Sequence, residues 1–380
     1  MQRTFRKVRY RTLSPIHIGD GNTLSNLEYF YYNRKIHLFN SEQLKRFLTK
    51  DQLEDFIQYV TNSESPSLLG FFETYSNTEK ILKFASKRAS SSLPLWGSET
   101  PQKIWTLIKS RNQPYIPGTE IKGALRTAIL RKLILDSSLT SFLSNEINKI
   151  KRKSLGNRKE VREELKKLEE KISQKVLRLR NDAKFDFLKF ILVSDAYSKN
   201  AERIIAKIQI KNSSRITGEF HEIISSNTEF QGEIGIIQGK QFEDFANHFG
   251  TDIQKKSFFG NLDQVLKACY EMSKEIIEEE LDFYRKLKVY SAISQLENIK
   301  RTNSENAPVI RIGKHQGFIS ITLAKLIKHL GDETYRNYVE LLKTTGRRIN
   351  TSNFPKTRKV VINPATKEEL TLGWIRIEVE

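Results

Sequence analysis

The chain has 380 residues and a formal net charge of +19, from 64 lysines and arginines against 45 aspartates and glutamates. Its 38% hydrophobic and 29% charged content is that of a globular protein, and no apolar run approaches the roughly 18 residues that span a bilayer. The single cysteine, Cys269, excludes an intramolecular disulfide and a CxxC metal or redox pair. Because the basic N-terminus lacks the apolar stretch of a secretory signal, we expect a cytoplasmic protein whose partner is a polyanion, most simply RNA or DNA.

The basic excess is concentrated in three blocks of the sequence. Residues 1–50 carry a net charge of +7, residues 111–182 carry +9 and residues 291–380 carry +6, whereas the remaining residues sum to −3. Segregation of this kind favours separate contact zones for one polyanion over a general basic coat.

The first hundred residues predict strands and then helices. Residues 7–12 alternate basic and apolar side chains, which predicts a strand with one basic face, and residues 17–22 follow as a glycine-containing loop. We expect a hairpin over residues 28–39. A helix should follow, capped by Ser41 and broken near Thr49.

Two helices are predicted in the middle of the chain. Pro117-Gly118 leads into a helix over about 120–135. A long, highly charged helix over 158–180 carries an apolar stripe, which predicts packing on its own domain or on a partner helix. The stripe consists of Val161, Leu165, Leu168, Ile172, Val176 and Leu179.

The second half alternates between strand and helix patterns. Strands are expected over 204–211, 229–236 and 373–379, and helical patterning over 241–287, 320–330 and 335–342. Strands and helices in both halves favour an α+β fold. We place an N-terminal domain at residues 1–182, including the charged helix, and a C-terminal domain at residues 183–380.

Four segments are candidates for binding chemistry. They are SPIHIGDG at 14–21, YIPGTEIKGALR at 115–126, RIGKHQGF at 311–318, and PKTRK at 355–359 with the closing Leu372-Gly373-Trp374. Glycine lets a phosphate approach backbone amides, and a loop that opens a helix adds the positive end of the helix dipole. Lys122 and Arg126 are four residues apart and therefore share a helical face. The absence of GxxxxGK[ST] and of a suitably placed GxGxxG excludes P-loop ATPases and dinucleotide-dependent dehydrogenases.

These segments together resemble the repeat-associated mysterious protein (RAMP) superfamily of CRISPR systems. The pairing of SPIHIGDG with YIPGTEIKGALRTAIL carries the resemblance, and FILVSDA, EFHEIISSNTEF and IRIGKHQGF extend it along the chain. The ending PKTRKVV…LGWIRIEV is most similar to the superfamily member that caps the 3′ end of the guide RNA (crRNA) in type III-A Csm effector complexes.

The resemblance implies two tandem ferredoxin-like, RRM-type domains that bind crRNA without cofactor or metal. It also implies contacts with the backbone RAMP subunit and the small helical subunit of the Csm complex, and with host trimming nucleases. Carried over by motif, the positions implied beside RNA are His17, Gly19, Asp20, Gly21, Gly118, Thr119, Lys122, Gly123, Arg126, Arg311, Gly313, Lys314, His315, Gln316, Gly317, Lys356, Arg358 and Lys359.

Two other functions fit the sequence. His17 could serve as the general acid or base of a RAMP-superfamily endoribonuclease that processes repeat RNA, and Asp20 could hold a catalytic metal. Each residue has a structural alternative, since His17 lies between two isoleucines and Asp20 could cap its own turn. The third function is an assembly subunit whose charge steers it onto a ribonucleoprotein without direct RNA capture.

Overall fold

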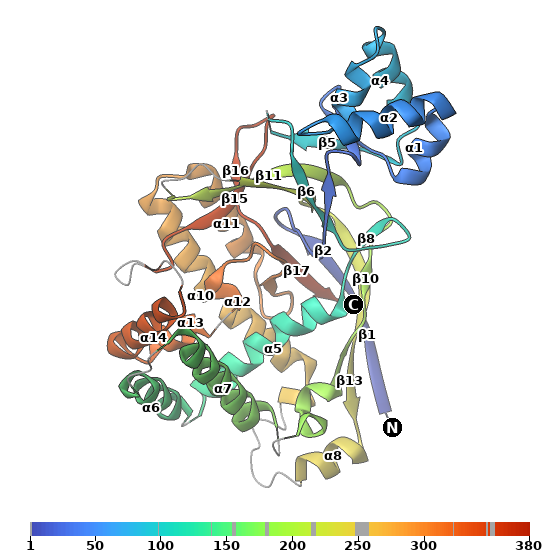
Figure 1. Ribbon diagram of the computed structural model, residues 1–380. Helices are drawn as coiled ribbons and strands as arrows, with labels where there is room; N and C mark the ends of the chain where they lie inside the picture. Colours follow the sequence, from blue (N-terminus) through green and yellow to red (C-terminus); the bar gives the residue numbers. More distant parts are fainter. Residues whose placement is uncertain are drawn as a thin grey trace.

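The computed structural model describes residues 2–97, 99–137, 139–153, 157–178, 182–213, 218–247, 258–321, 323–346, 349 and 354–380. These residues form two β-sheets covered by helices, with a small helical lobe projecting from one end (Figure 1). The predicted combination of α-helices and β-sheets is confirmed. Within the described ranges, no helix is both long and apolar enough to cross a membrane.

The first sheet joins strands from both ends of the chain. Its order is β14-β17-β1-β13-β10-β8-β7, with β9 also paired to β13. The long strand β1 (Gln2–Thr12) pairs antiparallel with β13 (Glu229–Gln238) on one side and with β17 (Trp374–Val379) on the other. The shorter strands are β7 (Lys109–Ser110), β8 (Gln113–Ile116), β9 (Ile191–Val193), β10 (Ala196–Tyr197) and β14 (Val309–Arg311).

The alternation predicted for β1 is present. Val8 and Tyr10 are buried, whereas Arg9 and Arg11 on the opposite face are partly exposed. Both arginines form ion pairs with acids of the neighbouring strands, Arg9 Nε with Glu378 Oε2 at 3.4 Å and Arg11 Nη2 with Glu229 Oε1 at 2.5 Å. The basic face of β1 is therefore partly neutralised within its own sheet.

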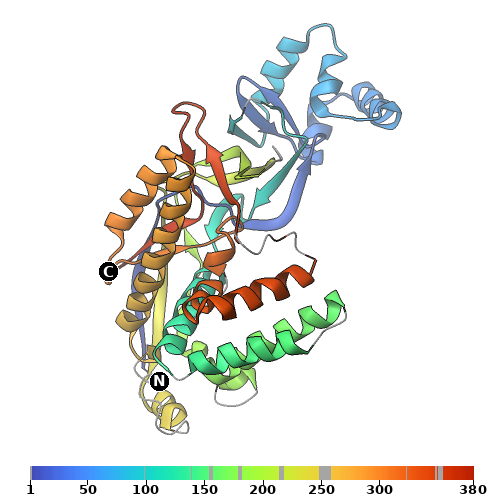
Figure 2. The same cartoon turned by 90° about the vertical axis from the view of Figure 1, so that its left-hand side faces the viewer.

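Two long helices complete a ferredoxin-like arrangement around this sheet. Helix α5 (Gly118–Leu135) follows β1, and α10 (Leu262–Lys286) follows β13 and packs on α5 (Figure 2). The strand order β17-β1-β13-β9/β10 with these two crossover helices is the βαββαβ pattern. This unit draws on both halves of the chain, so the predicted boundary at residue 182 does not divide the sheets. The expected pair of tandem ferredoxin-like domains is not confirmed.

The second sheet is built from segments inserted between the elements of that unit. Its order is β2-β6-β12-β11-β5-β4-β3, and β15 pairs with β11 and β16. Strands β2 to β6 are Gly19–Ser25, Tyr29–Tyr32, Lys35–Leu38, Ser91–Trp96 and Lys103–Leu107. Strands β11, β12, β15 and β16 are Arg203–Lys211, Gly218–Ile224, Arg358–Ile362 and Glu369–Leu370.

The projecting lobe holds four short helices beside β3, β4 and β5 (Figure 1). They are α1 (Ser41–Phe47), α2 (Lys50–Asn62), α3 (Leu68–Glu73) and α4 (Thr78–Ser86). The N-cap of α1 is Asn40 and not the expected Ser41, because Asn40 and Gln43 form a reciprocal capping box. The predicted break near Thr49 is confirmed, since Thr49 caps α2 in the same way with Gln52.

The remaining helices cover the main core. The charged helix is α7 (Arg158–Leu177), and most of its apolar stripe is buried in the molecule's own core, while Leu179 lies outside the described residues. Arg162 Nη2 donates to the Thr345 carbonyl at 2.9 Å, which connects α7 to the C-terminal end of α14 (Asp332–Thr344). The other elements are α6 (Leu139–Arg152), η1 (Ala183–Phe185), η2 (Phe187–Phe190), α8 (Lys240–Asn247), α11 (Tyr290–Thr302), α12 (Phe318–Ile321), α13 (Ala324–His329) and α14 (Asp332–Thr344).

Candidate functional site

The four segments identified in the sequence meet at the junction of the two sheets. The loop after β1 lies between the loop after β14 and the segment that enters β17, and α5 reaches the same place through the Glu120 side chain. The joining hydrogen bonds run from Lys314 N to His17 O at 2.9 Å, from Gly373 N to Pro15 O at 3.0 Å, from Ile312 N to Gly373 O at 2.8 Å and from Gly313 N to Glu120 Oε2 at 3.3 Å.

Two of the predicted glycines are required by this junction itself. Gly313 has φ +84°, and a Cβ there would clash with the carbonyl oxygen of His17. A Cβ on Gly118 would lie 2.8 Å from the Ser194 carbonyl oxygen, and the Gly118 amide donates to Asp195 Oδ1 at 2.8 Å. Close packing of protein on protein therefore explains these glycines. At three other glycines, Gly21, Gly123 and Gly317, no backbone atom of the surrounding protein lies close to the position of a Cβ.

Three buried histidines form a cluster beneath the junction. His17 and His315 were predicted from sequence, and His221 on β12 joins them. The ring centroids are 4.4 Å apart for His221 and His315, 4.6 Å for His17 and His221, and 5.6 Å for His17 and His315. His221 lies inside the EFHEIISSNTEF segment, but nothing in that pattern marks it as a partner of the two loops.

Hydrogen bonds at both ends of the cluster determine where its protons lie. Lys359 Nζ donates to His315 Nδ1 at 3.2 Å, so His315 carries its proton on Nε2 and donates to His221 Nδ1 at 3.4 Å. His221 Nε2 in turn faces Glu219 Oε2 at 3.5 Å. His17 Nδ1 donates to the Glu222 carbonyl at 2.7 Å, which leaves its Nε2 as an unpartnered acceptor among the described residues.

This environment keeps all three histidines neutral. Burial lowers the pKa of each ring, and the positive charge of Lys314 lowers them further. The side chain of His17 is enclosed, with the residue only 2% exposed and Gly19 packed against its Nε2. A neutral, enclosed imidazole is poorly placed to exchange a proton with an RNA on the surface.

Asp20 stabilises its own turn. Its carboxylate accepts from Thr106 Oγ1 at 2.6 Å, from the Asn22 amide at 2.9 Å and from Asn22 Nδ2 at 3.1 Å. Partial burial opposes ionisation, but these hydrogen bonds outweigh it and lower the pKa of Asp20. In the part of the chain that the structure describes, no group of three or more His, Cys, Asp or Glu side chains could hold a metal ion.

A tryptophan with two lysines lies on the surface above the histidine cluster. Lys314 Nζ lies 3.6 Å from the ring centroid of Trp105, and Lys103 Nζ lies 5.2 Å from it. The ring of Trp105 also stacks on His221, with the centroids 6.1 Å apart. Both lysines are exposed, so they can move from the ring to a phosphate without breaking a buried pair. Neither Trp105 nor Lys103 was singled out from the sequence, because each belongs to an ordinary strand pattern.

The predicted cations on α5 face the charged helix. Lys122 and Arg126 do share a helical face, as expected, and Arg126 Nη2 donates to Ser173 Oγ on α7 at 2.6 Å. Half-burial lowers the pKa of Lys122, while Asp186 opposes the effect. Arg126 also lines a 360 Å³ cavity with residues of α7. Thr119 and Gly123 on the same helix are exposed.

Two predicted arginines belong to a buried ion triad. Glu280 on α10 is fully buried, and Arg311 Nη1 lies 3.2 Å from its Oε2, while Arg358 Nε contacts its Oε1. Arg311 and Arg358 are only 4% and 5% exposed. Both side chains therefore neutralise a carboxylate in the core. Lys356 is exposed, whereas Lys359, Gln316 and Gly317 are partly buried.

Related proteins match this chain over different shares of its length. A protein described as CRISPR system Cms protein Csm5 from Methanocaldococcus jannaschii is 24% identical over 392 residues, which cover 98% of this chain and 88% of that protein. The protein of the same description from Streptococcus thermophilus is 27% identical over 140 residues, covering 34% of this chain and 38% of its own length.

Solved structures share the fold over the full chain. A chain of a cryo-EM structure of a Csm–crRNA–target RNA ternary complex of a type III-A CRISPR-Cas system matches with a TM-score of 0.67 at 18% identity, over 99% of this chain and 100% of that chain. The crystal structure of T. onnurineus Csm5 matches with a TM-score of 0.63 at 18% identity, over 97% and 99%. The model of the RAMP superfamily matches residues 9–289, which is most of the sequence, so the chain belongs to the RAMP superfamily.

Proposed function

We propose that this chain is a non-catalytic crRNA-binding subunit of a type III-A CRISPR Csm effector complex. It caps the 3′ end of the crRNA in the cytoplasm and supports crRNA maturation and antiviral defence. The observation that carries the proposal is the junction where four distant segments meet beneath the exposed Lys314 and Lys103 and the half-buried Trp105. Similarity to Csm5 proteins over 98% of the chain supports the assignment to the Csm complex.

The surface at the junction suits single-stranded RNA. Lysines that rest on the face of Trp105 can transfer to phosphates, and the uncovered ring can then stack a base. Gly21, Thr119 and Gly123 are exposed, so the backbone of segments 14–21 and 115–126 is accessible to RNA at these positions. RNA bound in this way is held by its backbone and by stacking, with little reading of base edges.

The structure of the junction favours binding over cleavage. His17 is neutral and enclosed, and the carboxylate of Asp20 is used by its own turn. An endoribonuclease that processes repeat RNA is the alternative. It predicts that the isolated protein cleaves repeat-containing RNA and that His17→Ala abolishes the cleavage, whereas our proposal predicts no cleavage by either protein.

The partners follow from the same proposal. We place the chain at the end of the Csm filament, in contact with crRNA, with the backbone RAMP subunit and with the small helical subunit, and we expect it to admit host nucleases that trim the crRNA. A purified complex without this chain should therefore contain crRNA of abnormal length. Normal crRNA in that complex would contradict the maturation role.

RNA binding is tested by removing the exposed cations of the junction. In the full chain, Lys314→Ala with Lys103→Ala should weaken binding to single-stranded RNA. The slope of log K against log salt should fall by about 0.7 for each phosphate that these lysines neutralise in the wild type. The matched control is Lys159→Ala, an exposed lysine on α7. RNA affinity and salt dependence equal to those of the wild type in the double variant would refute binding at this surface and favour an assembly subunit without direct RNA capture.

A further inference from the structure

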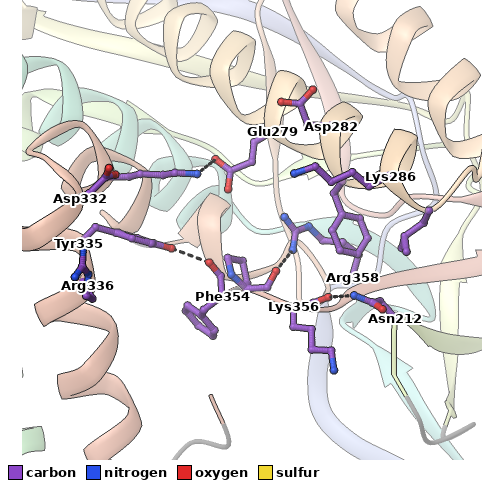
Figure 3. Close-up of a pocket in the computed structure, with 14 residues that line it drawn as sticks. Asn212, Glu279, Asp282, Lys286, Asp332, Tyr335, Arg336, Phe354, Lys356 and Arg358 are labelled. Carbon is purple, nitrogen blue, oxygen red and sulfur yellow. Dashed lines mark hydrogen bonds and ion pairs between the residues drawn. The ribbon is translucent and has the colours of Figure 1, made fainter. Parts of the chain in front are cut away.

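A cavity lies between α10, α14 and the start of β15. It has a volume of about 740 Å³, within the range of small-molecule sites. Figure 3 shows aromatic rings and charged groups from the three elements around one central space. Its inner wall has the half-buried Glu279, Phe283, Tyr335 and Phe354, and the exposed charged groups of its rim are Asp282, Lys286, Lys328, Asp332, Arg336 and Lys356.

Glu279 is a carboxylate on the inner wall with one oxygen available. Its Oε2 accepts from Lys325 Nζ at 2.5 Å and lies 4.0 Å from Lys328 Nζ. Neither contact involves Oε1, and among the described residues Oε1 has no hydrogen-bond donor. The close-up shows Glu279 as one of the side chains that line the cavity. This oxygen can accept a hydrogen bond from a hydroxyl group of a ligand, and its negative charge would repel a phosphate.

Aromatic rings line the inner wall around that carboxylate. The guanidinium of Arg358 lies over the ring of Phe283, 4.4 Å from the ring centroid. The rings of Phe354 and Phe318 pack edge to face, with their centroids 4.7 Å apart. The Tyr335 hydroxyl donates to the Phe354 carbonyl at 2.9 Å, which holds α14 against the segment before β15. Rings fixed in this way offer a surface for a flat aromatic group such as a nucleobase.

Cations surround the entrance. Lys286, Lys328, Arg336 and Lys356 lie on the rim with exposed side chains, so a phosphate at the entrance meets positive charge from several elements. The N-terminus of α14 also lies at this rim; Gly331 has no side chain to cap it, but Asp332 and Glu333 in its first turn offset the positive end of the helix dipole. Of the two rim carboxylates, Asp282 pairs with Arg285 at 3.6 Å.

We infer that this cavity receives the 3′-terminal ribonucleotide of the crRNA, with its free 2′,3′-diol donating to Glu279. The inference rests on the proposed function and specifies which chemical group of the RNA end is recognised. A phosphate binds at the cationic rim, the base lies on the aromatic wall, and the terminal hydroxyls reach Oε1 of Glu279 on the inner wall. An internal nucleotide carries a phosphate in place of its 3′-hydroxyl, so Glu279 repels it and selects the end of the strand.

The test compares RNA ends on the full-length protein. Three RNAs of one sequence, labelled at the 5′ end, terminate in a 3′-hydroxyl, a 3′-phosphate or a 2′,3′-dideoxynucleotide, and affinity is measured by fluorescence anisotropy. The wild type should bind the hydroxyl end about tenfold more tightly than either other end, the scale of one discriminating polar contact. In Glu279→Gln the penalty for the 3′-phosphate should disappear, because the repelling charge is gone.

Glu278→Gln is the matched control. Glu278 is the neighbouring residue on α10, but its partner is Lys300 at 2.6 Å and it does not line the cavity, so this variant should discriminate between ends as the wild type does. Equal affinity of the wild type for all three ends overturns the inference and leaves RNA binding by the junction intact. If the wild type binds none of the three RNAs, both the proposed function and this inference are refuted.

Discussion

Acidification should destabilise this protein through the cluster of His17, His221 and His315. The perturbation is a change from pH 6.5 to pH 5.5, which begins to charge histidines in the unfolded chain, where their pKa is about 6.5. In the folded protein, burial and nearby lysines hold the pKa of all three below that value. The unfolded state therefore binds the additional protons, and stability that is fully present above pH 6.5 is lost as the pH falls.

The magnitude follows from linkage. A histidine that stays neutral in the folded state costs about 1 kcal/mol of unfolding free energy between pH 6.5 and pH 5.5, so His221 and His315 together cost about 2 kcal/mol, and His17 adds to this loss. Since small proteins are stable by only about 5–15 kcal/mol, this loss is a large fraction of the total. Lys314 and Lys359 add to the effect of burial at His221 and His315, whereas Glu222 and Asp20 oppose it at His17 and make the contribution of that ring smaller.

The assay is urea denaturation at 25 °C across this pH range, with His315→Asn compared to the wild type. The variant should lose about 1 kcal/mol less between pH 6.5 and pH 5.5, whatever its stability at neutral pH, because one titrating group has been removed. Gln316→Asn changes the same loop without removing a titrating group and should retain the wild-type pH dependence. A pH dependence in His315→Asn equal to that of the wild type would refute the reasoning.

Three further predictions concern stability at neutral pH. Gly313→Ala should destabilise the protein by more than about 1 kcal/mol in thermal denaturation, because its positive φ and its close approach to His17 leave no room for a Cβ. Gly123→Ala faces open space within α5 and should stabilise the protein by about 0.5–1 kcal/mol; destabilisation there would contradict the open environment of this glycine. Arg358→Met should cost about 3–5 kcal/mol in urea denaturation, because Glu280 keeps its burial and loses one of two cations. Arg358→Met with Glu280→Leu and Arg311→Met leaves no buried charge without a partner and should recover much of that loss; no recovery would show that Arg358 acts outside the triad.

Local structure could be predicted wherever it depends on neighbouring residues. The alternation in β1, the break before α2 at Thr49 and the apolar stripe of α7 are all visible in the sequence, because periodicity and caps act over a few residues. The cap of α1 lies one residue earlier than predicted, since Asn40 and Ser41 are both good capping residues and only the Gln43 side chain decides between them.

The chemistry of the junction could be predicted only in part. His17 and His315 stand beside glycines in sequence and can be recognised there, whereas His221 lies in an ordinary strand pattern and becomes a partner only through tertiary packing. The same reason explains why the ion triad of Arg311, Arg358 and Glu280 could not be predicted. A basic segment looks alike whether its side chains meet RNA or a buried acid, and Glu280 lies in a third segment of the sequence.

The pairing of the first and last strands explains why a boundary at residue 182 does not divide the sheets. Tyr10 of β1 lies opposite Ile377 of β17, a register between residues far apart in sequence that no local pattern encodes. The same pairing draws the segment before β17 onto the loop after β1, where Gly373 bonds to Pro15. The candidate RNA surface therefore depends on both ends of the chain, because the junction forms only when the sheet is completed by its last strand. An N-terminal fragment ending near residue 182 would keep the charge of two basic blocks and lose the surface that we propose binds RNA.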